Sequence, residues 1–195
     1  MNRPKLLVLD GQGVVFDAPI KRFLGAFAHD NRLDYGAVMR RWEDGLRHLA
    51  WTGAIDDDDL WHELAGKPID VRQTMLALST SYQPGPVASY LATWSQQVPI
   101  WLLSNHRSSW LVPQLVSMNL VGAFQRLLIS DATGLVKPDP NAFGPLLDGT
   151  LDPGDILFVD DQLPNVHAAE QLGLKTLHAS PHHGWVADLN RYLHA

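Results

Sequence analysis

Residues 6–15 read Leu-Leu-Val-Leu-Asp-Gly-Gln-Gly-Val-Val, and the interpretation of the whole chain starts from this stretch. The unbroken apolar run at residues 6–9 is typical of a strand that is buried on both faces. The run stops at Asp10, and Gly11 and Gly13 then loosen the backbone. An acid at the carboxyl end of a central parallel strand lies where open α/β sheets bind their ligands. Taken alone, the same pattern also fits an aspartate that caps a turn or a helix.

The composition excludes several classes of protein. The chain has 195 residues, of which 46% are hydrophobic, and a net charge of −6 without long charged blocks. This charge pattern lacks the basic footprint of a nucleic-acid binder, so we expect no nucleic-acid partner. No apolar run approaches the roughly 20 residues that span a bilayer, and no secretory segment opens the chain, so we expect a cytoplasmic protein without a membrane partner. The absence of cysteine excludes disulfides and thiol chemistry. Nothing in the sequence predicts the oligomeric state.

Four more short apolar runs follow the first one and predict further strands, at residues 100–103, 127–129, 156–159 and 175–178. Helical periods lie between them, which indicates a parallel sheet with right-handed crossovers. The predicted fold is therefore α/β, with a Rossmann-like parallel sheet core. We expect helices after Pro140 and over residues 108–120, 165–172 and 185–193.

The stretch between the first two strands is too long for a single crossover and has helical periods throughout. One predicted helix buries Ile20, Phe23, Leu24 and Phe27. Another buries Val38, Trp42, Leu46 and Leu49. Acid-rich residues 56–59 predict a solvated helix start, and two more helices are expected over 71–78 and 87–97. We therefore expect an all-helical cap domain at residues 19–97, inserted into a discontinuous core of residues 1–18 and 98–195.

Polar side chains follow several of the predicted strands. They are Asp10 after the first strand, Ser104 and Asn105 after the second, and Asp160 and Asp161 after the fourth. Carboxyl ends of parallel strands meet at one edge of a sheet, and Lys137 can reach that edge from its Gly/Pro-constrained loop. Clustered carboxylates need a cation, and oxygen ligands suit Mg²⁺. Each residue alone has a simpler explanation, as a turn, a cap or a surface lysine. Together they predict a phosphoryl site.

The order and spacing of these groups resemble the haloacid dehalogenase-like hydrolase superfamily, in the branch whose helical cap follows the first strand. The resemblance covers essentially the whole chain. Its four motifs are LLVLDGQGVVFD around Asp10, WLLSN with Ser104, GLVKPDPNAF with Lys137, and ILFVDDQLPNVHAAEQLG with Asp160, Asp161 and Asn165.

The resemblance implies a role for each matching residue. Asp10 is the nucleophile that becomes an aspartyl-phosphate, and Lys137 neutralises charge between it and the phosphoryl group. Ser104 and the backbone around Asn105 hold phosphate oxygens. Mg²⁺ is held by Asp10, by the backbone carbonyl of Gln12 and by Asp161, with help from Asp160. Asn165 steadies this metal-binding loop, and the cap closes over a small phosphorylated substrate.

Gln12 departs from the family pattern, in which phosphatases usually carry a second aspartate two residues after the nucleophile. That aspartate protonates the leaving group and later activates water, and an amide can do neither. General acid–base help is worth roughly 10²–10⁴-fold in rate, or about 3–5 kcal/mol. Some similar branches of the family also lack this aspartate.

Three hypotheses follow. The first is a Mg²⁺-dependent phosphatase of a small phosphorylated metabolite. The second is a carbon–halogen hydrolase in which Asp10 attacks carbon, although that branch needs no metal and does not usually keep paired acids such as Asp160 and Asp161. The third is a phosphometabolite- or protein-binding module with weakened catalysis.

The cap sequence does not identify the substrate. Its candidate contacts are polar or aromatic, namely Arg22, His29, Arg40, Arg41, Trp42, His48, Trp51 and His62. We expect the tryptophans to belong mainly to the core.

Overall fold

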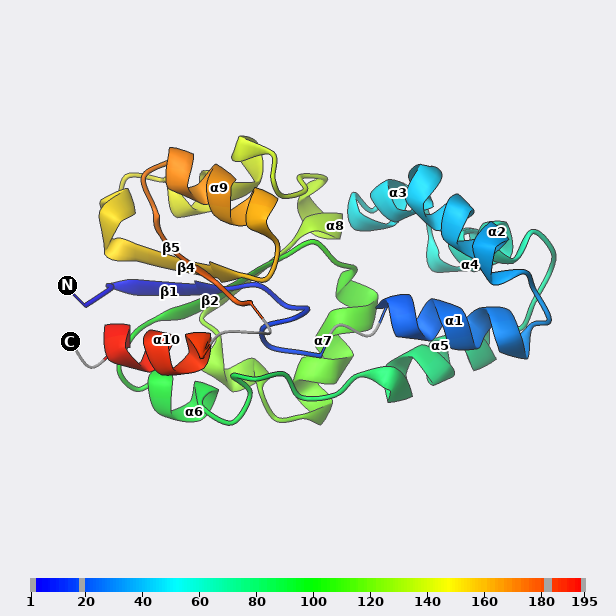
Figure 1. The fold of residues 1–195 in the computed structure, drawn as a ribbon, viewed down its shortest axis with the longest axis horizontal. Helices are drawn as coiled ribbons and strands as arrows, with labels where there is room; N and C mark the ends of the chain where they lie inside the picture. Colours follow the sequence, from blue (N-terminus) through cyan, green and yellow to red (C-terminus); the bar gives the residue numbers. More distant parts are fainter. Residues whose placement is uncertain (1–2, 18–19, 181–183, 194–195) are drawn as a thin grey trace.

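A computed structural model describes residues 3–17, 20–180 and 184–193 of the chain. Strand β1 (Leu6–Leu9) lies at the centre of a five-stranded sheet of order β3-β2-β1-β4-β5 (Figure 1). The other strands are β2 (Ile100–Ser104), β3 (Arg126–Ile129), β4 (Ile156–Asp160) and β5 (Lys175–His178). All four pairings are parallel, so the predicted α/β fold with a parallel sheet is confirmed.

Alternating side chains of β1 pack on opposite faces of the sheet. Leu6 and Val8 pack in one cluster with Phe143 of the 3₁₀ helix Pro140–Leu146 and with Ala169 of α9 (Leu163–Gln171). Leu7 and Leu9 pack in the other cluster, with α7 (Ser108–Ser117), α10 (Trp185–Leu193) and α6 (Leu91–Trp94). Because β1 is buried on both faces, a continuous apolar run suits it. Three further short elements follow β2 in the sequence, namely α8 (Ser130–Thr133) and the 3₁₀ turns Val121–Ala123 and Pro153–Asp155.

Helices of the predicted cap lie beyond the end of the sheet at which β1 leads into Asp10 (Figure 1). They are α1 (Ile20–Asp30), α2 (Tyr35–Arg41), α3 (Arg47–Trp51), α4 (Asp57–Ala65) and α5 (Val71–Ser81). The acid-rich start of α4 is confirmed, because the Asp56 carboxylate accepts a hydrogen bond from the backbone N–H of Asp59 at 2.8 Å. Trp61 stacks on Trp110 of α7 at 5.3 Å between ring centroids, which joins the helical part to the sheet part.

The helix predicted across residues 38–49 is broken at Gly45, and its buried face changes there. The segment Trp42–Leu46 joins α2 to α3 through a kink, because Gly45 has φ 152° and ψ −35°, outside the helical range. The kink changes the direction of the chain, so the side chains of α3 do not continue the buried face of α2. Leu49 is consequently 39% exposed, whereas Ala50 and Trp51 are buried. The expectation that Leu49 continues the apolar face was wrong for this reason.

The helix predicted over residues 87–97 is mostly absent, and only α6 forms there. The preceding segment is tied to the loop after Asp10, because Gly85 N–H donates to the Val15 carbonyl at 2.8 Å. A Cβ at Gly85 would lie 2.6 Å from the Val14 carbonyl oxygen, so this close approach needs glycine. The helix predicted over 108–120 ends at Ser117, and the helix expected after Pro140 is a 3₁₀ helix.

The division into core and cap stays a prediction, and residues 18 and 19, at its first boundary, lie outside the described residues. Near the second boundary, α6 lies beside α10 (Figure 1), and Trp94 Nε1 donates to Asn190 Oδ1 at 2.9 Å. This contact favours a cap that ends before α6. Within the part of the chain that the structure describes, no helix combines the length and apolar character that crossing a bilayer requires.

Candidate active site

Lys137 lies at the centre of the candidate site, where it joins the ends of three strands. Its Nζ donates to Oδ1 of Asp10 at 2.7 Å, to Oδ2 of Asp160 at 2.7 Å and to the carbonyl of Leu103 at 2.6 Å. All three charged groups are buried, with 4%, 0% and 4% exposure for Asp10, Asp160 and Lys137. A buried ammonium is tolerable only with such partners, and the two carboxylates raise the pKa of Lys137 against the opposing effect of its burial. The structure thus brings the lysine of the 134–140 loop to the predicted edge of the sheet.

Both oxygens of Asp160 are already engaged by the protein. In addition to Lys137, they accept hydrogen bonds from Asn165 Nδ2 at 3.1 and 3.0 Å, and Oδ1 accepts the backbone N–H of Gln162 at 2.8 Å. Asn165 lies in the first turn of α9, beside this carboxylate. This arrangement holds Asp160 rigidly. Because neither of its oxygens is free, Asp160 is better suited to orienting Lys137 than to binding a cation.

Asp161 differs from Asp160 because one of its carboxylate oxygens is left without a protein partner. Its Oδ1 is buried and has no hydrogen-bond partner in the described part of the chain. Gly13 makes room for this side chain, because a Cβ on Gly13 would lie 2.5 Å from Asp161 Oδ2, and its φ of 81° also favours glycine. Burial, reinforced by the charge of Asp160, raises the pKa of Asp161 to about 6. Burying a carboxylate oxygen without a partner costs free energy, unless a ligand binds to that oxygen.

The acid cluster fits a divalent cation. Asp10, Asp160 and Asp161 each offer one oxygen, and these oxygens lie within 4.8 Å of one another. Burial is also the main cause that raises the pKa of Asp10 to about 7, with Lys137 acting against it and Asp160 adding to it. A hard cation that prefers oxygen ligands, such as Mg²⁺, would favour the charged form of both acids. The unpaired oxygen of Asp161 is the observation that supports this fit most directly.

Ser104 and Asn105 lie beside the Lys137 loop but differ in what their side chains do. Ser104 is 2% exposed, and no described residue hydrogen-bonds its hydroxyl. Gly11 allows this proximity, since a Cβ there would lie 2.6 Å from Ser104 Oγ. The Asn105 side chain instead clamps the backbone of Lys137, by accepting its N–H at 2.8 Å and donating to its carbonyl at 2.7 Å. Ser104 is therefore available for a ligand, whereas the Asn105 side chain positions the lysine.

The side chain of Gln12 contacts His106, which Tyr82 contacts in turn, and the sequence reasoning missed both of these residues. Gln12 Nε2 lies 3.1 Å from Nε2 of His106, and Tyr82 Oη lies 3.0 Å from the same ring nitrogen. His106 is fully buried, and this burial lowers its pKa to about 4, so the ring is neutral at pH 7. His106 follows Asn105 directly in the sequence, and that adjacency was the one signal that could have identified it.

Arg107 was also missed, although it ties the sheet part to the helical part. Its Nε lies 2.8 Å from Asp57 Oδ1, and its guanidinium donates to the Ile55 carbonyl at 2.7 Å. Trp110 Nε1 and Ser109 Oγ donate to the same carboxylate, at 2.8 and 3.0 Å. These contacts hold the start of α4 against the start of α7.

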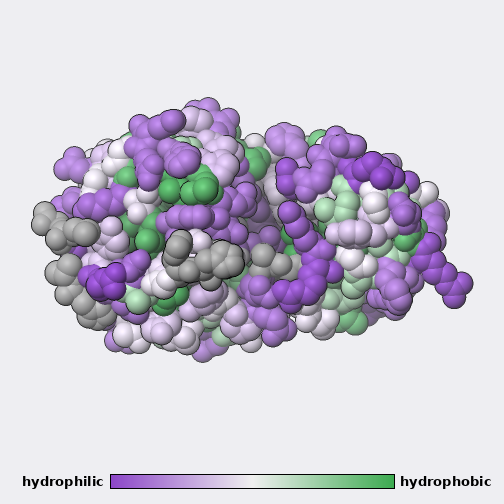
Figure 2. All heavy atoms as spheres, viewed as in Figure 1, coloured by the Kyte–Doolittle hydropathy of each residue, from purple (hydrophilic) through white to green (hydrophobic). Residues whose placement is uncertain are grey.

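A cavity of about 840 Å³ lies between these two parts, and Figure 2 shows the molecule hollowed between them. Its core wall includes the predicted residues Asp10, Gln12, Ser104, Asn105, Lys137, Asp161 and Asn165. Its cap wall consists of Ile20, Lys21, Trp42, Arg47, His48 and Trp51. Of the eight candidate cap contacts, Trp42, His48 and Trp51 line this cavity, and both tryptophans are also buried as expected. The volume suits a small molecule.

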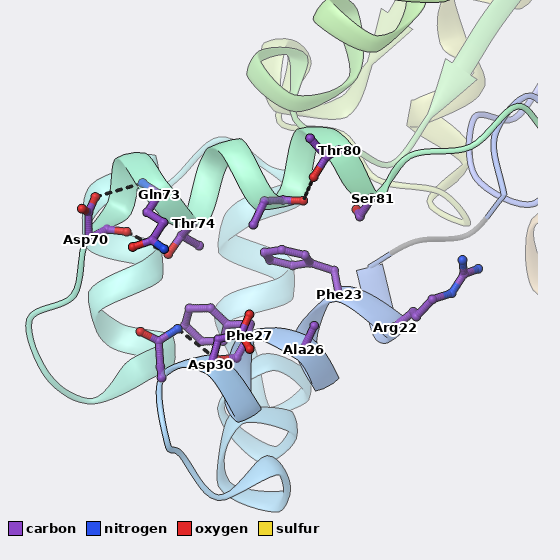
Figure 3. A pocket seen from close by; sticks show the side chains of 12 residues that line it. Arg22, Phe23, Ala26, Phe27, Asp30, Asp70, Gln73, Thr74, Thr80 and Ser81 are labelled. Carbon is purple, nitrogen blue, oxygen red and sulfur yellow. Dashed lines mark hydrogen bonds between the residues drawn. The ribbon is translucent and has the colours of Figure 1, made fainter.

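The other candidate cap contacts, such as Arg22, do not line this cavity. Arg22 lines a separate cavity of about 280 Å³ between α1 and α5 (Figure 3). Phe23 and Phe27 point into it from α1, and Gln73 and Thr80 border it from α5. None of the predicted catalytic or metal-binding residues lines this second cavity, so it is not the candidate active site.

No family model matches the chain. A curated relative, D-ribitol-5-phosphate phosphatase from Bacteroides thetaiotaomicron, is 24% identical over 98% of this chain and 99% of its own length.

Solved structures with the same fold include a HAD family enzyme from B. thetaiotaomicron, at a TM-score of 0.77 and 20% identity, covering 96% of this chain and 99% of that one. The same enzyme has been crystallised with magnesium and inorganic phosphate. The L-2-haloacid dehalogenase of Xanthobacter autotrophicus also aligns, at a TM-score of 0.67 and 18% identity, over 90% of this chain and 77% of that one. The resemblance inferred from the four motifs is therefore confirmed at the level of the fold.

Proposed function

This chain has the fold of the haloacid dehalogenase-like hydrolases, and we propose that it is a Mg²⁺-dependent phosphatase of a small phosphorylated metabolite. The observation that carries the proposal is the cluster in which Lys137 bridges Asp10 and Asp160 beside the unpaired oxygen of Asp161. The phosphatase activity of the curated relative, and the magnesium and phosphate bound by the solved enzyme, support the same reaction class.

Asp10 and Asp161 would hold Mg²⁺, together with the backbone carbonyl of Gln12, and Asp160 would support the site by fixing Lys137. When bound, the cation supplies positive charge to the phosphoryl oxygens. Lys137 adds a second positive charge next to Asp10, and the free hydroxyl of Ser104 donates a hydrogen bond to a phosphoryl oxygen. Water-poor surroundings strengthen each of these interactions.

Two displacements at phosphorus complete the proposed reaction. An oxygen of Asp10 attacks phosphorus, the bond from phosphorus to the ester oxygen breaks, and the alcohol leaves with a proton from water. Water then attacks the aspartyl-phosphate, the bond between phosphorus and the Asp10 oxygen breaks, and phosphate is released. Both steps need proton transfer, which the amide of Gln12 cannot supply. We therefore expect the second step to be slow enough for the aspartyl-phosphate to accumulate.

The Gln12 side chain has a different role in this proposal. His106, itself in contact with Tyr82, holds the Gln12 side chain at the cavity wall, so Gln12 offers a fixed hydrogen bond to the ester oxygen or to the attacking water. Orientation of this kind lowers the barrier without moving a proton.

Hydrolysis of p-nitrophenyl phosphate tests the proposal directly. We expect turnover that requires Mg²⁺, stops when a chelator is added and is lost in Asp10→Asn. Asp58→Asn is the matched control, because it makes the same chemical change at an exposed position in the first turn of α4 and should retain activity.

The same preparation discriminates the two other hypotheses. Metal-independent halide release from a 2-haloacid would favour carbon–halogen hydrolysis, which the structural similarity to the X. autotrophicus dehalogenase keeps as a second candidate. Saturable phosphate binding without any turnover would favour a binding module.

A further inference from the structure

The two walls of the large cavity differ in charge. The core wall carries the acids Asp10, Asp139 and Asp161, and Lys137 is its one cation. The cap wall carries no acid among its lining residues, and its polar members are Lys21, Arg47 and His48, which we call the donor wall. Lysine and arginine have hydrogen-bond donors and no acceptors. The protein has a net charge of −6, so a cavity wall with cationic residues and no acid differs in charge from the protein as a whole.

Most of the donor wall is free to bind a ligand. The side chains of Lys21 and His48 have no hydrogen-bond or ion-pair partner among the described residues. Arg47 pairs with Glu43 at 2.7 Å, but these side chains are 49% and 37% exposed, and such exposed pairs contribute little to stability. A ligand that excludes water would therefore compete well for this guanidinium.

The break at Gly45 gives the donor wall its position. Trp42 precedes the break, Arg47, His48 and Trp51 follow it, and all four line the cavity. A Cβ on Gly45 would meet nothing within 4 Å, so glycine is needed there for its φ of 152° and not for space. Here the kink brings the side chains of Arg47, His48 and Trp51 to one wall of the cavity.

The phosphoryl group does not need the donor wall, because Lys137, Ser104 and the metal-binding acids serve it from the core side. We propose that the donor wall binds a second anionic group on the leaving alcohol, so that the substrates are phosphate monoesters bearing a carboxylate or a further phosphate. The inference rests on the proposed phosphatase function and adds the chemical class of the substrate. The acids of the core wall would repel this second anionic group, and binding it at the donor wall keeps it away from them.

A matched pair of substrates tests this inference. 3-Phosphoglycerate and glycerol 3-phosphate differ by a carboxylate in place of a hydroxymethyl group. We expect kcat/KM to favour 3-phosphoglycerate by roughly tenfold or more, chiefly through KM, because a charge-assisted hydrogen bond contributes in both ground and transition states. The bisphosphate of glycerol, compared with glycerol 3-phosphate, shows whether a second phosphate serves equally well.

Variants identify the residues responsible. In the double variant Lys21→Ala and Arg47→Ala, the ratio of kcat/KM for 3-phosphoglycerate over glycerol 3-phosphate should fall towards one. Arg40→Ala is the control, because Arg40 is an exposed cation of α2 that pairs with Asp34 and does not line the cavity. It should leave the ratio unchanged.

The outcomes separate this inference from the proposed function. A kcat/KM for glycerol 3-phosphate equal to or above that for 3-phosphoglycerate, or a ratio unchanged in the double variant, would overturn the donor wall as an anion site and leave the phosphatase intact. Loss of all Mg²⁺-dependent phosphate release, including that from p-nitrophenyl phosphate, would overturn the proposed function and the inference with it.

Discussion

The side-chain nitrogen of Lys137 lies 2.7 Å from Oδ1 of Asp10, although 127 residues separate the two in the sequence. Asp160 accepts from the same nitrogen, so one buried ammonium neutralises part of the charge of two buried carboxylates. Removing one partner of a buried ion pair leaves the other charge uncompensated, which typically costs about 3–5 kcal/mol. The contact therefore serves folding as well as the proposed chemistry.

The first prediction concerns this contact. Lys137→Met keeps much of the side-chain volume but removes the charge, and we expect it to lower the free energy of unfolding by about 3 kcal/mol or more. Urea denaturation of the metal-free protein measures this loss. Because a bound cation can replace part of the missing charge, saturating Mg²⁺ should restore more stability to the variant than to the wild type. Equal stabilisation of both by Mg²⁺ would contradict a shared site for the cation and the ammonium.

The second prediction concerns the pH dependence of Mg²⁺ binding. The pKa values of Asp10 and Asp161 are raised to about 7 and about 6, so both acids hold protons that a cation must displace. Affinity should rise as the pH increases from 5 to 8, and fall by up to about tenfold per pH unit for each acid below its pKa. Calorimetry in buffers of different ionisation enthalpy should detect proton release at pH 6. Affinity that does not change over this range would argue against these acids as ligands.

The third prediction concerns Gln12. Gln12→Asp introduces a group that can exchange a proton. We expect it to raise kcat/KM for alkyl phosphates more than for aryl phosphates, because kcat/KM reports the first displacement, in which alkoxides are the poorer leaving groups. The slope of log kcat/KM against leaving-group pKa measures the effect and should become shallower in the variant. Gln12→Asn, which shortens the side chain equally but keeps the amide, is the matched control and should not change the slope. An equal gain on both substrate classes would mean that another group carries the proton.

The fourth prediction concerns His106, whose pKa burial lowers to about 4 from an ordinary value near 6.5. The neutral ring stabilises the fold above pH 6.5, and this contribution is lost as the pH falls towards 4, by up to about 1.4 kcal/mol per pH unit. Asp10 and Asp161 have raised pKa values and act with the opposite sign in the same range. The informative quantity is therefore the stability difference between His106→Asn and the wild type at each pH. That difference should shrink on acidification, and a constant difference would contradict a neutral buried ring.

The sequence could predict the sheet and the residues at its edge because both follow from local patterns. Apolar runs that end in Asp10, Ser104 and Asp160 identify strands and their carboxyl ends together, and a parallel sheet brings those ends to one edge. Lys137 was identifiable because its loop is constrained by glycine and prolines and matches a family motif.

The cap was harder to predict because its geometry depends on a single backbone break. The kink at Gly45 changes which residues face the core, so Leu49 was assigned to the wrong face and Arg47 was not considered as a cavity residue. Lys21 was missed because an exposed lysine on an amphipathic helix looks like any other until the cavity beside it is known. The partners of Gln12 were missed because Tyr82 and Gln12 meet at His106 only through tertiary packing.

Acid-quench labelling tests whether Asp10 is the residue that takes up the phosphoryl group. The protein is mixed with a phosphate monoester labelled at phosphorus in the presence of Mg²⁺, quenched in acid during turnover and digested for peptide mapping. Because Gln12 cannot activate water, we predict an acid-stable, hydroxylamine-sensitive label on the peptide that contains Asp10, and no label in Asp10→Asn. Label on a different residue, or phosphate release that survives in Asp10→Asn, would show that Asp10 is not the nucleophile.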